Sequence, residues 1–338
     1  MIIFFTDNKT FFGKFVCMLL TISMLIFIKE SVDAENTQPQ LHAVAAALYD
    51  VDNGTTIYSK NANESMANAS TTKILTCIVA LENASLDDVV TVTAEAASQP
   101  QVKLGLKEGQ SYNMKDLMYG MMLESYNDCA YAIAEYVGGS ADGFAQLLNQ
   151  KANFIGCYGT YFLTPNGLDK EDEISFHHTT ANDLCIIMSY CAWHSPKASE
   201  FLEITETTEY RYKDENGQRS FKNHNRLLTE TDYVISGKTG FTTKAGYCYV
   251  AAIEKDGRKM CLSLLGCGWP NNKNYKWEDA KKLVEYGAGA EDSFSTAVTD
   301  KTAGTEMPAV NKTENKTKNK TILHDFANYF TINLGFFY

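Results

Sequence analysis

The chain has 338 residues, of which 45% are hydrophobic and 21% charged, and its formal net charge is −11. This length and balance are typical of a globular protein with one large domain or two modest ones, and they exclude a disordered chain. The negative charge argues against nucleic acid as a partner, because binding to phosphates depends on clustered lysine and arginine side chains. Net charge by itself indicates no particular substrate.

The N-terminus has the pattern of a secretory signal peptide over residues 1–34. Lys9 and Lys14 precede a mainly apolar run over 15–28. That run is shorter than the roughly 20 residues that a membrane-spanning helix needs. Small side chains lead up to Ala34, so we predict cleavage after this residue and export of the mature protein. An uncleaved N-terminal membrane anchor is the alternative interpretation.

The first half of the predicted catalytic domain, 35–290, contains one hairpin followed by helices. Two short apolar runs on either side of Asp52-Asn53-Gly54 predict a β-hairpin, because this turn sequence tolerates positive φ. Amphipathic or apolar patterns then predict helices from about Ser70 to Glu82, Met114 to Met122, Asp128 to Val137, Asp142 to Phe154 and Thr180 to Trp193.

The second half of this domain changes to the period of β-strands. Three antiparallel strands are predicted over 234–240, 246–253 and 260–265, with an Asp256-Gly257 hairpin turn before the last. A helix over 277–286 follows, and Gly287 is predicted to end it. We therefore expect an α+β fold, in which an antiparallel sheet with strands from both ends of the domain is flanked by a helical block.

The composition changes again after the predicted catalytic domain. Residues 291–321 contain few large apolar side chains and three copies of Asn-Lys-Thr, which indicates a flexible basic linker. The tail over 322–338 is rich in aromatic and aliphatic residues but too short and interrupted to span a bilayer. One interpretation is a segment that lies on a membrane surface. Packing back onto the domain and an accidental terminus are the alternatives.

Eight of the nine cysteines follow the predicted signal peptide, an even number that would allow disulfides. Several of them lie inside apolar helix or strand patterns, where a free cysteine behaves as a small hydrophobic residue. Their spacing includes no Cys-x-x-Cys pair of the kind that binds zinc. The sequence therefore favours free buried thiols over bridges.

The first candidate catalytic motif is Ser70-Thr71-Thr72-Lys73, at the start of a predicted helix. Residues three apart share a helix face, so the Lys73 amine can reach the Ser70 hydroxyl. A serine needs a base beside it to act as a nucleophile, and a lysine can serve once burial or neighbouring charge lowers its pKa. Taken alone the motif is weak, because a helix N-cap followed by a surface lysine has the same spacing.

The second candidate motif is Ser125-Tyr126-Asn127, at a turn before another predicted helix. Its hydroxyl and carboxamide are two residues apart, so on a tight turn both can face one site. Ser125 would then pass protons between Lys73 and a leaving nitrogen, and Asn127 would hold the amide of the substrate. A polar turn without a catalytic role is the alternative.

The third candidate motif is Lys238-Thr239-Gly240, on a predicted strand. Lys238 supplies a positive charge and Thr239 a hydroxyl, which together suit a substrate carboxylate. Gly240 lets a ligand approach the strand closely, as an added β-strand would. An edge-strand lysine before a turn is the alternative for this motif alone.

In this order the three motifs match the set found in penicillin-binding proteins and class A β-lactamases. The sequence resembles the low-molecular-mass penicillin-binding proteins of the serine-type D-Ala-D-Ala carboxypeptidase family, peptidase family S11. The likeness covers about residues 41–290 and is strongest in the segments 69–76, 125–130, 164–169, 178–184, 223–228 and 237–248.

The resemblance implies a serine β-lactamase/DD-peptidase-like fold and a two-step hydrolysis in the cell wall or at the outer face of the cytoplasmic membrane. Ser70, deprotonated by Lys73, would attack the carbonyl between the two D-alanines that end a peptidoglycan stem peptide. The oxyanion would lie between the backbone N–H groups of Ser70 and Phe241. The last D-alanine would leave, protonated through Ser125, and water would hydrolyse the acyl-enzyme. β-Lactams would acylate Ser70 as inhibitors, and neither a cofactor nor a metal is implied.

Two other functions and one variant of the reaction remain as alternatives. A class A β-lactamase shares the motifs, but its fast deacylation depends on a Glu-x-x-Leu-Asn segment that this sequence lacks between the second and third motifs. A non-catalytic domain that binds β-lactams or cell wall would not require Ser70, Lys73 and Ser125 together. A transpeptidase differs only in the acceptor of the acyl group, which the sequence leaves open.

Overall fold

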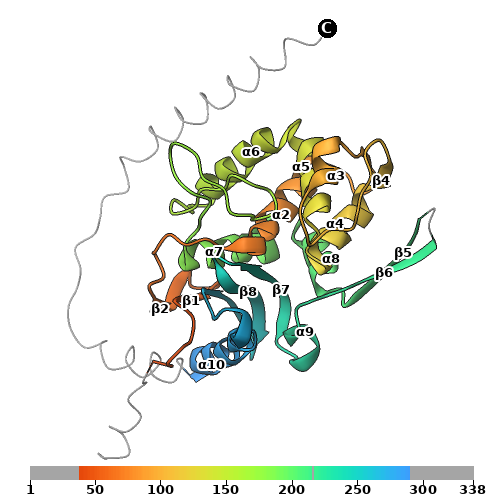
Figure 1. Ribbon diagram of the computed structural model, residues 1–338. Helices are drawn as coiled ribbons and strands as arrows, with labels where there is room; N and C mark the ends of the chain where they lie inside the picture. The colour runs from red at the N-terminus through yellow and green to blue at the C-terminus, as the bar shows by residue number, and fades with distance from the viewer. Residues whose placement is uncertain (1–37, 215–216, 290–338) are drawn as a thin grey trace, which may run out of the picture. The chain divides into compact units, whose positions relative to one another are not determined.

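The computed structural model describes residues 38–214 and 217–289, and its centre is a five-stranded antiparallel sheet (Figure 1). The strand order is β2-β1-β9-β8-β7. The strands are β1 (Ala45–Asp50), β2 (Thr55–Lys60), β7 (Val234–Thr242), β8 (Gly246–Lys255) and β9 (Arg258–Leu265). β1 pairs with β9 in a register that places Ala47 opposite Ser263, so the two ends of the domain meet in the sheet. The predicted hairpin and the three later strands are confirmed.

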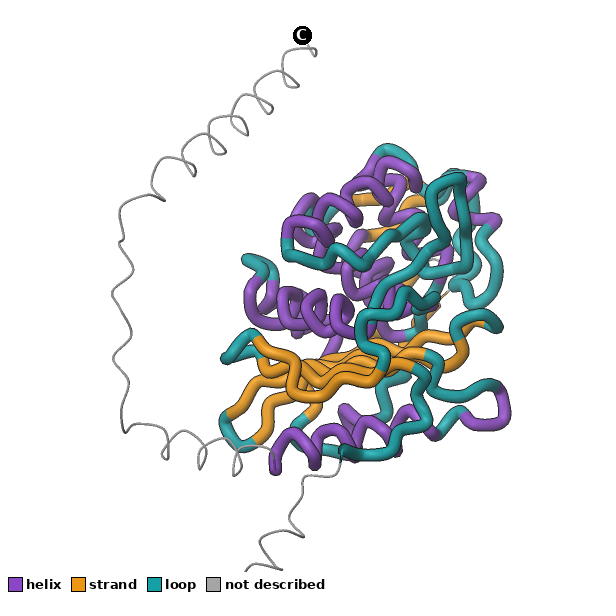
Figure 2. Tube along the Cα trace, turned by 90° about the vertical axis from the view of Figure 1, so that its left-hand side faces the viewer, coloured by secondary structure: helices purple, strands orange, loops and turns teal. Residues whose placement is uncertain are grey.

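Both faces of the sheet are covered, which Figure 2 shows as a layer of strands between α10 and a larger helical block. α10 (Tyr275–Gly289) packs on one face, where Trp277 and Leu283 join a core cluster with Tyr249 of β8. α7 (Ala181–Ser189) packs on the other face against β1 and β9. The central strands β1, β8 and β9 are therefore mostly buried on both sides, because each face meets apolar helix residues, whereas the edge strand β2 is largely exposed.

The helical block is built around α2 (Lys73–Asn83), whose residues from Lys73 to Leu81 are all buried. An almost wholly apolar helix of this kind belongs inside a domain. The other elements of the block and its connections are α3 (Ala94–Ser98), α4 (Met114–Leu123), α5 (Asn127–Gly138), α6 (Ala141–Phe154), α8 (Ala198–Glu206), α9 (Leu227–Glu230), β3 (Val89–Thr91) and β4 (Ser111–Asn113). The predicted helices at α4, α5 and α6 are confirmed within a residue or two of their ends.

Three predicted helix ends differ from the structure. Ser70 lies in a 3₁₀ turn, η1 (Ala69–Thr72), so the α-helix itself begins at Lys73. The helix predicted to reach Trp193 is α-helical only to Ser189, and a π-helical turn, η2 (Tyr190–His194), continues it. Gly287 does not end the last helix, since it lies inside α10 where a Cβ would stand 2.6 Å from Leu48. The close approach of helix to sheet explains a glycine at that position.

The hairpin of β5 (Glu209–Asp214) and β6 (Gly217–Lys222) is not predicted from the sequence, and it extends beside α8 and α9 in Figure 1. Its aromatic residues pack against the helical block. The ring of Tyr210 stacks on Tyr119 of α4 with the centroids 3.8 Å apart, and Phe221 meets Tyr126 edge to face with the centroids 5.6 Å apart. The hairpin thus packs beside the second motif.

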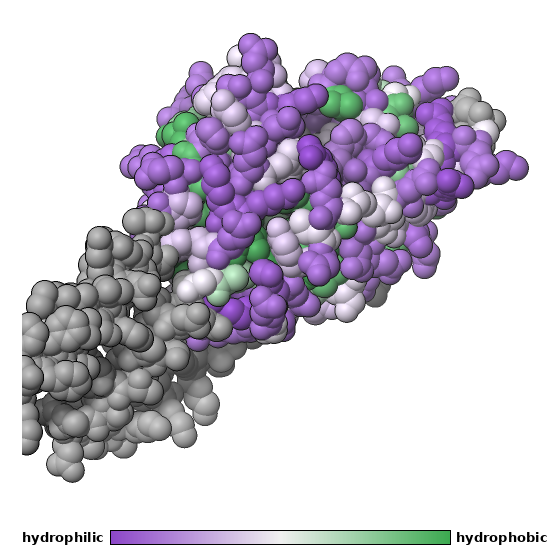
Figure 3. All heavy atoms as spheres, turned by 90° about the horizontal axis from the view of Figure 1, so that it is seen from below, coloured by the Kyte–Doolittle hydropathy of each residue, from purple (hydrophilic) through white to green (hydrophobic). Residues whose placement is uncertain are grey.

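The eight cysteines from Cys77 to Cys267 are all buried free thiols, which confirms the prediction from their apolar surroundings. In Figure 3 the visible surface is mainly hydrophilic, with apolar residues in small groups, as expected where a surface meets water. Within residues 38–214 and 217–289, no helix combines the length and the apolar character that crossing a bilayer requires. The predicted signal peptide, linker and C-terminal tail lie outside the described residues.

Candidate active site

The turn that carries Ser70 has an unusual backbone. Ala69, directly before it, has a φ of +48°, in the left-handed region that side chains rarely adopt. The buried side chain of Asn68 stabilises the turn, since its Nδ2 donates to Thr71 Oγ1 at 3.0 Å and to Thr72 Oγ1 at 2.9 Å. Strained backbone of this kind persists only where its surroundings hold it. Here it places the half-buried Ser70 just before the N-terminus of α2.

Lys73 is fully buried one helical turn after Ser70. Its Nζ lies 2.8 Å from Ser70 Oγ, 3.0 Å from Asn127 Oδ1 and 2.7 Å from the Asn166 carbonyl oxygen. A neutral amine fits these three neighbours, because it donates two hydrogen bonds to the carbonyl groups and accepts one from a hydroxyl.

Burial, and then the positive charge of Lys238, hold the pKa of Lys73 well below its usual range. A lysine of lowered pKa beside a serine is the pairing that the first motif predicts, and the role of Lys73 as a base stays a prediction.

The second motif meets Lys73 from the start of α5. Ser125 has a φ of +66°, and Asn127 is almost fully buried as the first residue of the helix. Besides contacting Lys73, the carboxamide of Asn127 donates from Nδ2 to the Pro100 carbonyl at 3.2 Å. Asn127 therefore orients Lys73, and its predicted contact with the substrate stays a prediction. Among the described residues Lys73 has no hydrogen bond to Ser125, so the proton relay also stays a prediction.

The buried carboxylate of Asp128 holds the loop 104–106 against the start of α5. Asp128 is fully buried, and it accepts hydrogen bonds from the backbone N–H groups of Leu104 at 2.9 Å, Gly105 at 2.7 Å and Leu106 at 3.0 Å. These charge-assisted bonds hold the loop against the N-terminus of α5. The sequence analysis did not identify this role for Asp128, because the partners are backbone groups more than 20 residues away.

The third motif lies on β7, beside Ser70. A Cβ at Gly240 would stand 2.9 Å from the backbone nitrogen of Ser70, which is closer than side-chain atoms tolerate. Lys238 is 2% exposed and burial lowers its pKa to about 7, while the charge of Glu124 opposes that shift. Thr239 is half-buried, and Phe241 is 41% exposed near the end of the strand. The fold therefore brings together all three predicted motifs.

Asn166 also lies at the candidate site, although none of the three motifs includes it. Its carbonyl oxygen accepts the hydrogen bond from Lys73 and lies 3.4 Å from Ser70 Oγ. Gly167 follows with a φ of +81°, and a Cβ there would be 1.9 Å from the Ala69 carbonyl oxygen. The Pro-Asn-Gly sequence does signal a turn that needs positive φ. It carries no signal that the turn packs against Ala69, the residue before Ser70.

The profile of the D-alanyl-D-alanine carboxypeptidase family matches residues 32–267. The D-alanyl-D-alanine carboxypeptidase DacF of Bacillus subtilis is 32% identical over 270 residues, which cover 76% of this chain and 65% of that protein. The chain therefore spans just under two thirds of the length of this relative. DacB2 of Mycobacterium tuberculosis is 31% identical over 240 residues, which cover 70% of this chain and 79% of that protein.

Solved structures show the same fold. A D-alanyl-D-alanine carboxypeptidase from Mycobacterium tuberculosis superposes with a TM-score of 0.68 at 28% identity, covering 74% of this chain and 92% of that one. Penicillin-binding protein D2 of Listeria monocytogenes in its cefotaxime-bound form gives a TM-score of 0.63 at 29% identity, covering 74% of this chain and 98% of that one. These similarities confirm the predicted α+β, DD-peptidase-like fold.

Proposed function

Because this chain belongs to the D-alanyl-D-alanine carboxypeptidase family, peptidase family S11, we propose that it removes the terminal D-alanine from peptidoglycan stem peptides through an acyl-Ser70 intermediate. The observation that carries the proposal is the 2.8 Å contact between Ser70 Oγ and the buried Nζ of Lys73. A hydroxyl paired with an amine of lowered pKa is the arrangement that activates a serine for nucleophilic attack.

In the acylation step, Lys73 Nζ takes the proton of Ser70 as Oγ attacks the carbonyl carbon between the two D-alanines. The negative oxygen that forms would accept hydrogen bonds from the backbone N–H groups of Ser70 and Phe241. The closeness of Gly240 to the Ser70 nitrogen supports this arrangement, since it brings β7 alongside the nucleophile. The bond to the leaving nitrogen then breaks as that nitrogen receives a proton by way of Ser125.

The terminal carboxylate of the substrate would bind between Lys238 and Thr239. Burial makes the charge of Lys238 costly, and a bound carboxylate stabilises that charge and raises the pKa again. After acylation, a water molecule attacks the ester carbonyl, and Ser70 recovers its proton as the shortened peptide leaves. The ring of a β-lactam offers a carbonyl of the same kind, which agrees with the β-lactam-bound forms of the Listeria relative.

The place of action is also part of the proposal. Peptidoglycan lies outside the cytoplasmic membrane, and the signal-peptide pattern over residues 1–34 would deliver the chain there. The aromatic and aliphatic tail over 322–338 would then hold the enzyme near its substrate by lying on the membrane surface.

Incubation of the full chain with a pentapeptide that ends in D-Ala-D-Ala, followed by mass measurement, tests this function. We expect a product shorter by one alanine, and no product from the Ser70→Ala variant. In a parallel incubation with an acceptor amine, a product joined to that amine, without free tetrapeptide, would assign the chain to the transpeptidases. An unchanged peptide beside rapid penicillin hydrolysis would contradict the proposal in favour of a β-lactamase. An unchanged peptide without such hydrolysis would favour a non-catalytic binding domain.

A further inference from the structure

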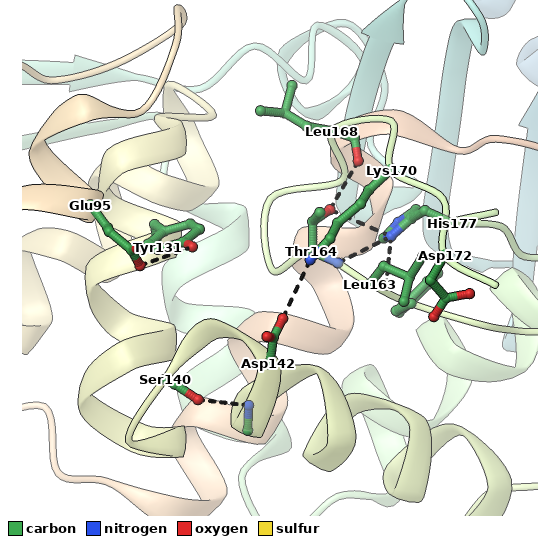
Figure 4. A network of polar contacts seen from close by, with 12 residues as sticks. Glu95, Tyr131, Ser140, Asp142, Leu163, Thr164, Leu168, Lys170, Asp172 and His177 are labelled. Carbon is green, nitrogen blue, oxygen red and sulfur yellow. Dashed lines mark hydrogen bonds and ion pairs between the residues drawn. The ribbon is translucent and has the colours of Figure 1, made fainter. Parts of the chain in front are cut away.

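A buried histidine lies behind the nucleophile, and none of the three motifs includes it. His177 is 2% exposed, and its ring stacks on Phe162 with the centroids 4.8 Å apart. Its Nδ1 accepts hydrogen bonds from the backbone N–H of Leu163 at 3.0 Å and that of Thr164 at 3.3 Å. Figure 4 shows the ring facing these two residues. One nitrogen of the ring thus holds the start of the loop that continues to Asn166 and Gly167.

The other ring nitrogen contacts the turn of the nucleophile. Because Nδ1 accepts two backbone hydrogen bonds, the proton of the neutral ring is on Nε2. Nε2 then donates to Thr72 Oγ1 at 2.9 Å. Burial, with a smaller contribution from His178, lowers the pKa of His177 to about 3, so the ring is neutral at pH 7.

Thr72 connects His177 to Ala69, the residue before Ser70, by hydrogen bonds. Its fully buried hydroxyl accepts from Asn68 Nδ2 at 2.9 Å and from His177, and it donates to the Ala69 carbonyl oxygen at 3.0 Å. A hydroxyl has one donor and two acceptor positions, so all three are used. The same Ala69 carbonyl is the atom against which Gly167 packs.

We infer that His177 is a positioning residue for acylation, joining the loop 163–168 to Thr72 and so keeping Ser70 and Lys73 in register. One end of this connection fixes the Ala69 carbonyl beside Ser70, and the other fixes the Asn166 carbonyl that orients Lys73. The inference rests on the proposed function in one respect, the roles of Ser70 and Lys73 as nucleophile and base. Loss of the connection should slow acylation itself, since the residues predicted to bind the substrate carboxylate, Lys238 and Thr239, lie on β7.

Two substitutions test the contributions of the two ring nitrogens separately. In His177→Asn, the side-chain oxygen takes the place of Nδ1 and still accepts from Leu163 and Thr164, but nothing reaches Thr72. In His177→Gln, the amide nitrogen takes the place of Nε2 and still donates to Thr72, but no acceptor remains for Leu163 and Thr164. The matched control is His178→Asn, because the partly buried His178 contacts the Phe176 carbonyl through Nδ1 at 2.6 Å and has no hydrogen bond to Thr72 in the described structure.

The experiment measures acylation of the full chain by a fluorescent penicillin over a range of concentrations, which separates the limiting acylation rate from the affinity of the preceding complex. We expect a limiting rate about 10- to 100-fold lower in His177→Asn, with unchanged affinity and one label per chain. His177→Gln breaks the connection at its other end and should also acylate more slowly than the wild type, whereas His178→Asn should acylate at close to the wild-type rate. Thr72→Val should slow acylation as His177→Asn does, and Thr72→Ser should restore it.

Wild-type rates in both His177→Asn and Thr72→Val would overturn the inference, as would equal slowing in His177→Asn, His177→Gln and His178→Asn. If His177→Asn labels substoichiometrically because it is misfolded, Thr72→Val and Thr72→Ser decide the outcome between them. A wild-type chain that no penicillin labels at Ser70 is a different result, which would overturn the proposed function and this inference with it.

Discussion

Replacement of Lys73 by arginine is expected to slow acylation of Ser70 by about 10³-fold, the contribution typical of a positioned general base. Arginine keeps a positive charge near Ser70, but it cannot give up its proton in a protein. The measurement is the second-order rate constant with a fluorescent penicillin. The exposed Lys107 offers a matched control, since Lys107→Arg should leave the rate unchanged.

The pH dependence of the same rate constant adds a second readout. Lys73 must be neutral to accept a proton, so the wild-type rate should rise with pH through the lowered pKa of Lys73. Lys238 must be charged to bind a carboxylate, so the rate should fall again as pH rises through about 7. Lys73→Arg should lack the rising limb. A near-normal rate in this variant, or a rising limb that persists, would show that another group is the base.

Replacement of Gly167 by alanine should reduce acylation by about 100-fold, because the loop that carries the Asn166 carbonyl would have to move by more than an ångström. The new Cβ would stand 1.9 Å from the Ala69 carbonyl oxygen, and the φ of +81° already disfavours a side chain. Overpacking of this kind should also lower the free energy of unfolding by about 1–3 kcal/mol beyond the backbone strain.

Gly156→Ala is the matched control for this substitution. Gly156 has a φ of +85°, but a Cβ there would meet no atom within 4 Å. It should therefore show only the strain of a left-handed residue, about 1–2 kcal/mol, with normal acylation. Thermal unfolding and penicillin acylation, measured on both variants, check the pair. Equal loss of stability in the two, with normal acylation by Gly167→Ala, would contradict the packing of this loop on the nucleophile.

The elements that the sequence predicted well are those with a strong local pattern. β8 and β9 are mainly apolar runs on either side of an Asp-Gly turn, and α5 ends where Gly139 adopts a φ of +71°. The hairpin of β5 and β6 was not predicted, although β5 alternates aromatic with charged residues as a half-buried strand does. Its aromatic residues pack against Tyr119 and Tyr126, which lie distant in the chain, so its place in the fold depends on tertiary contacts.

The residues of the candidate site also differ in whether a local sequence pattern identifies them. Residues that act through distinctive side chains, such as Ser70, Lys73 and Lys238, could be predicted from motifs with fixed spacing. Asn166 acts through a backbone carbonyl, which every residue has, so its role depends on where the fold places it. His177 acts through two contacts that lie at different distances along the chain, and a lone histidine in a sequence gives no sign of either.

The central claim is that Ser70 is the nucleophile, and mass mapping of the β-lactam adduct tests it most directly. The full chain is incubated with a β-lactam, digested, and searched for the peptide that has gained its mass. The account predicts one adduct per chain, on the peptide that contains Ser70, and none in Ser70→Ala. An adduct on a different residue, or an undiminished adduct in Ser70→Ala, would contradict it.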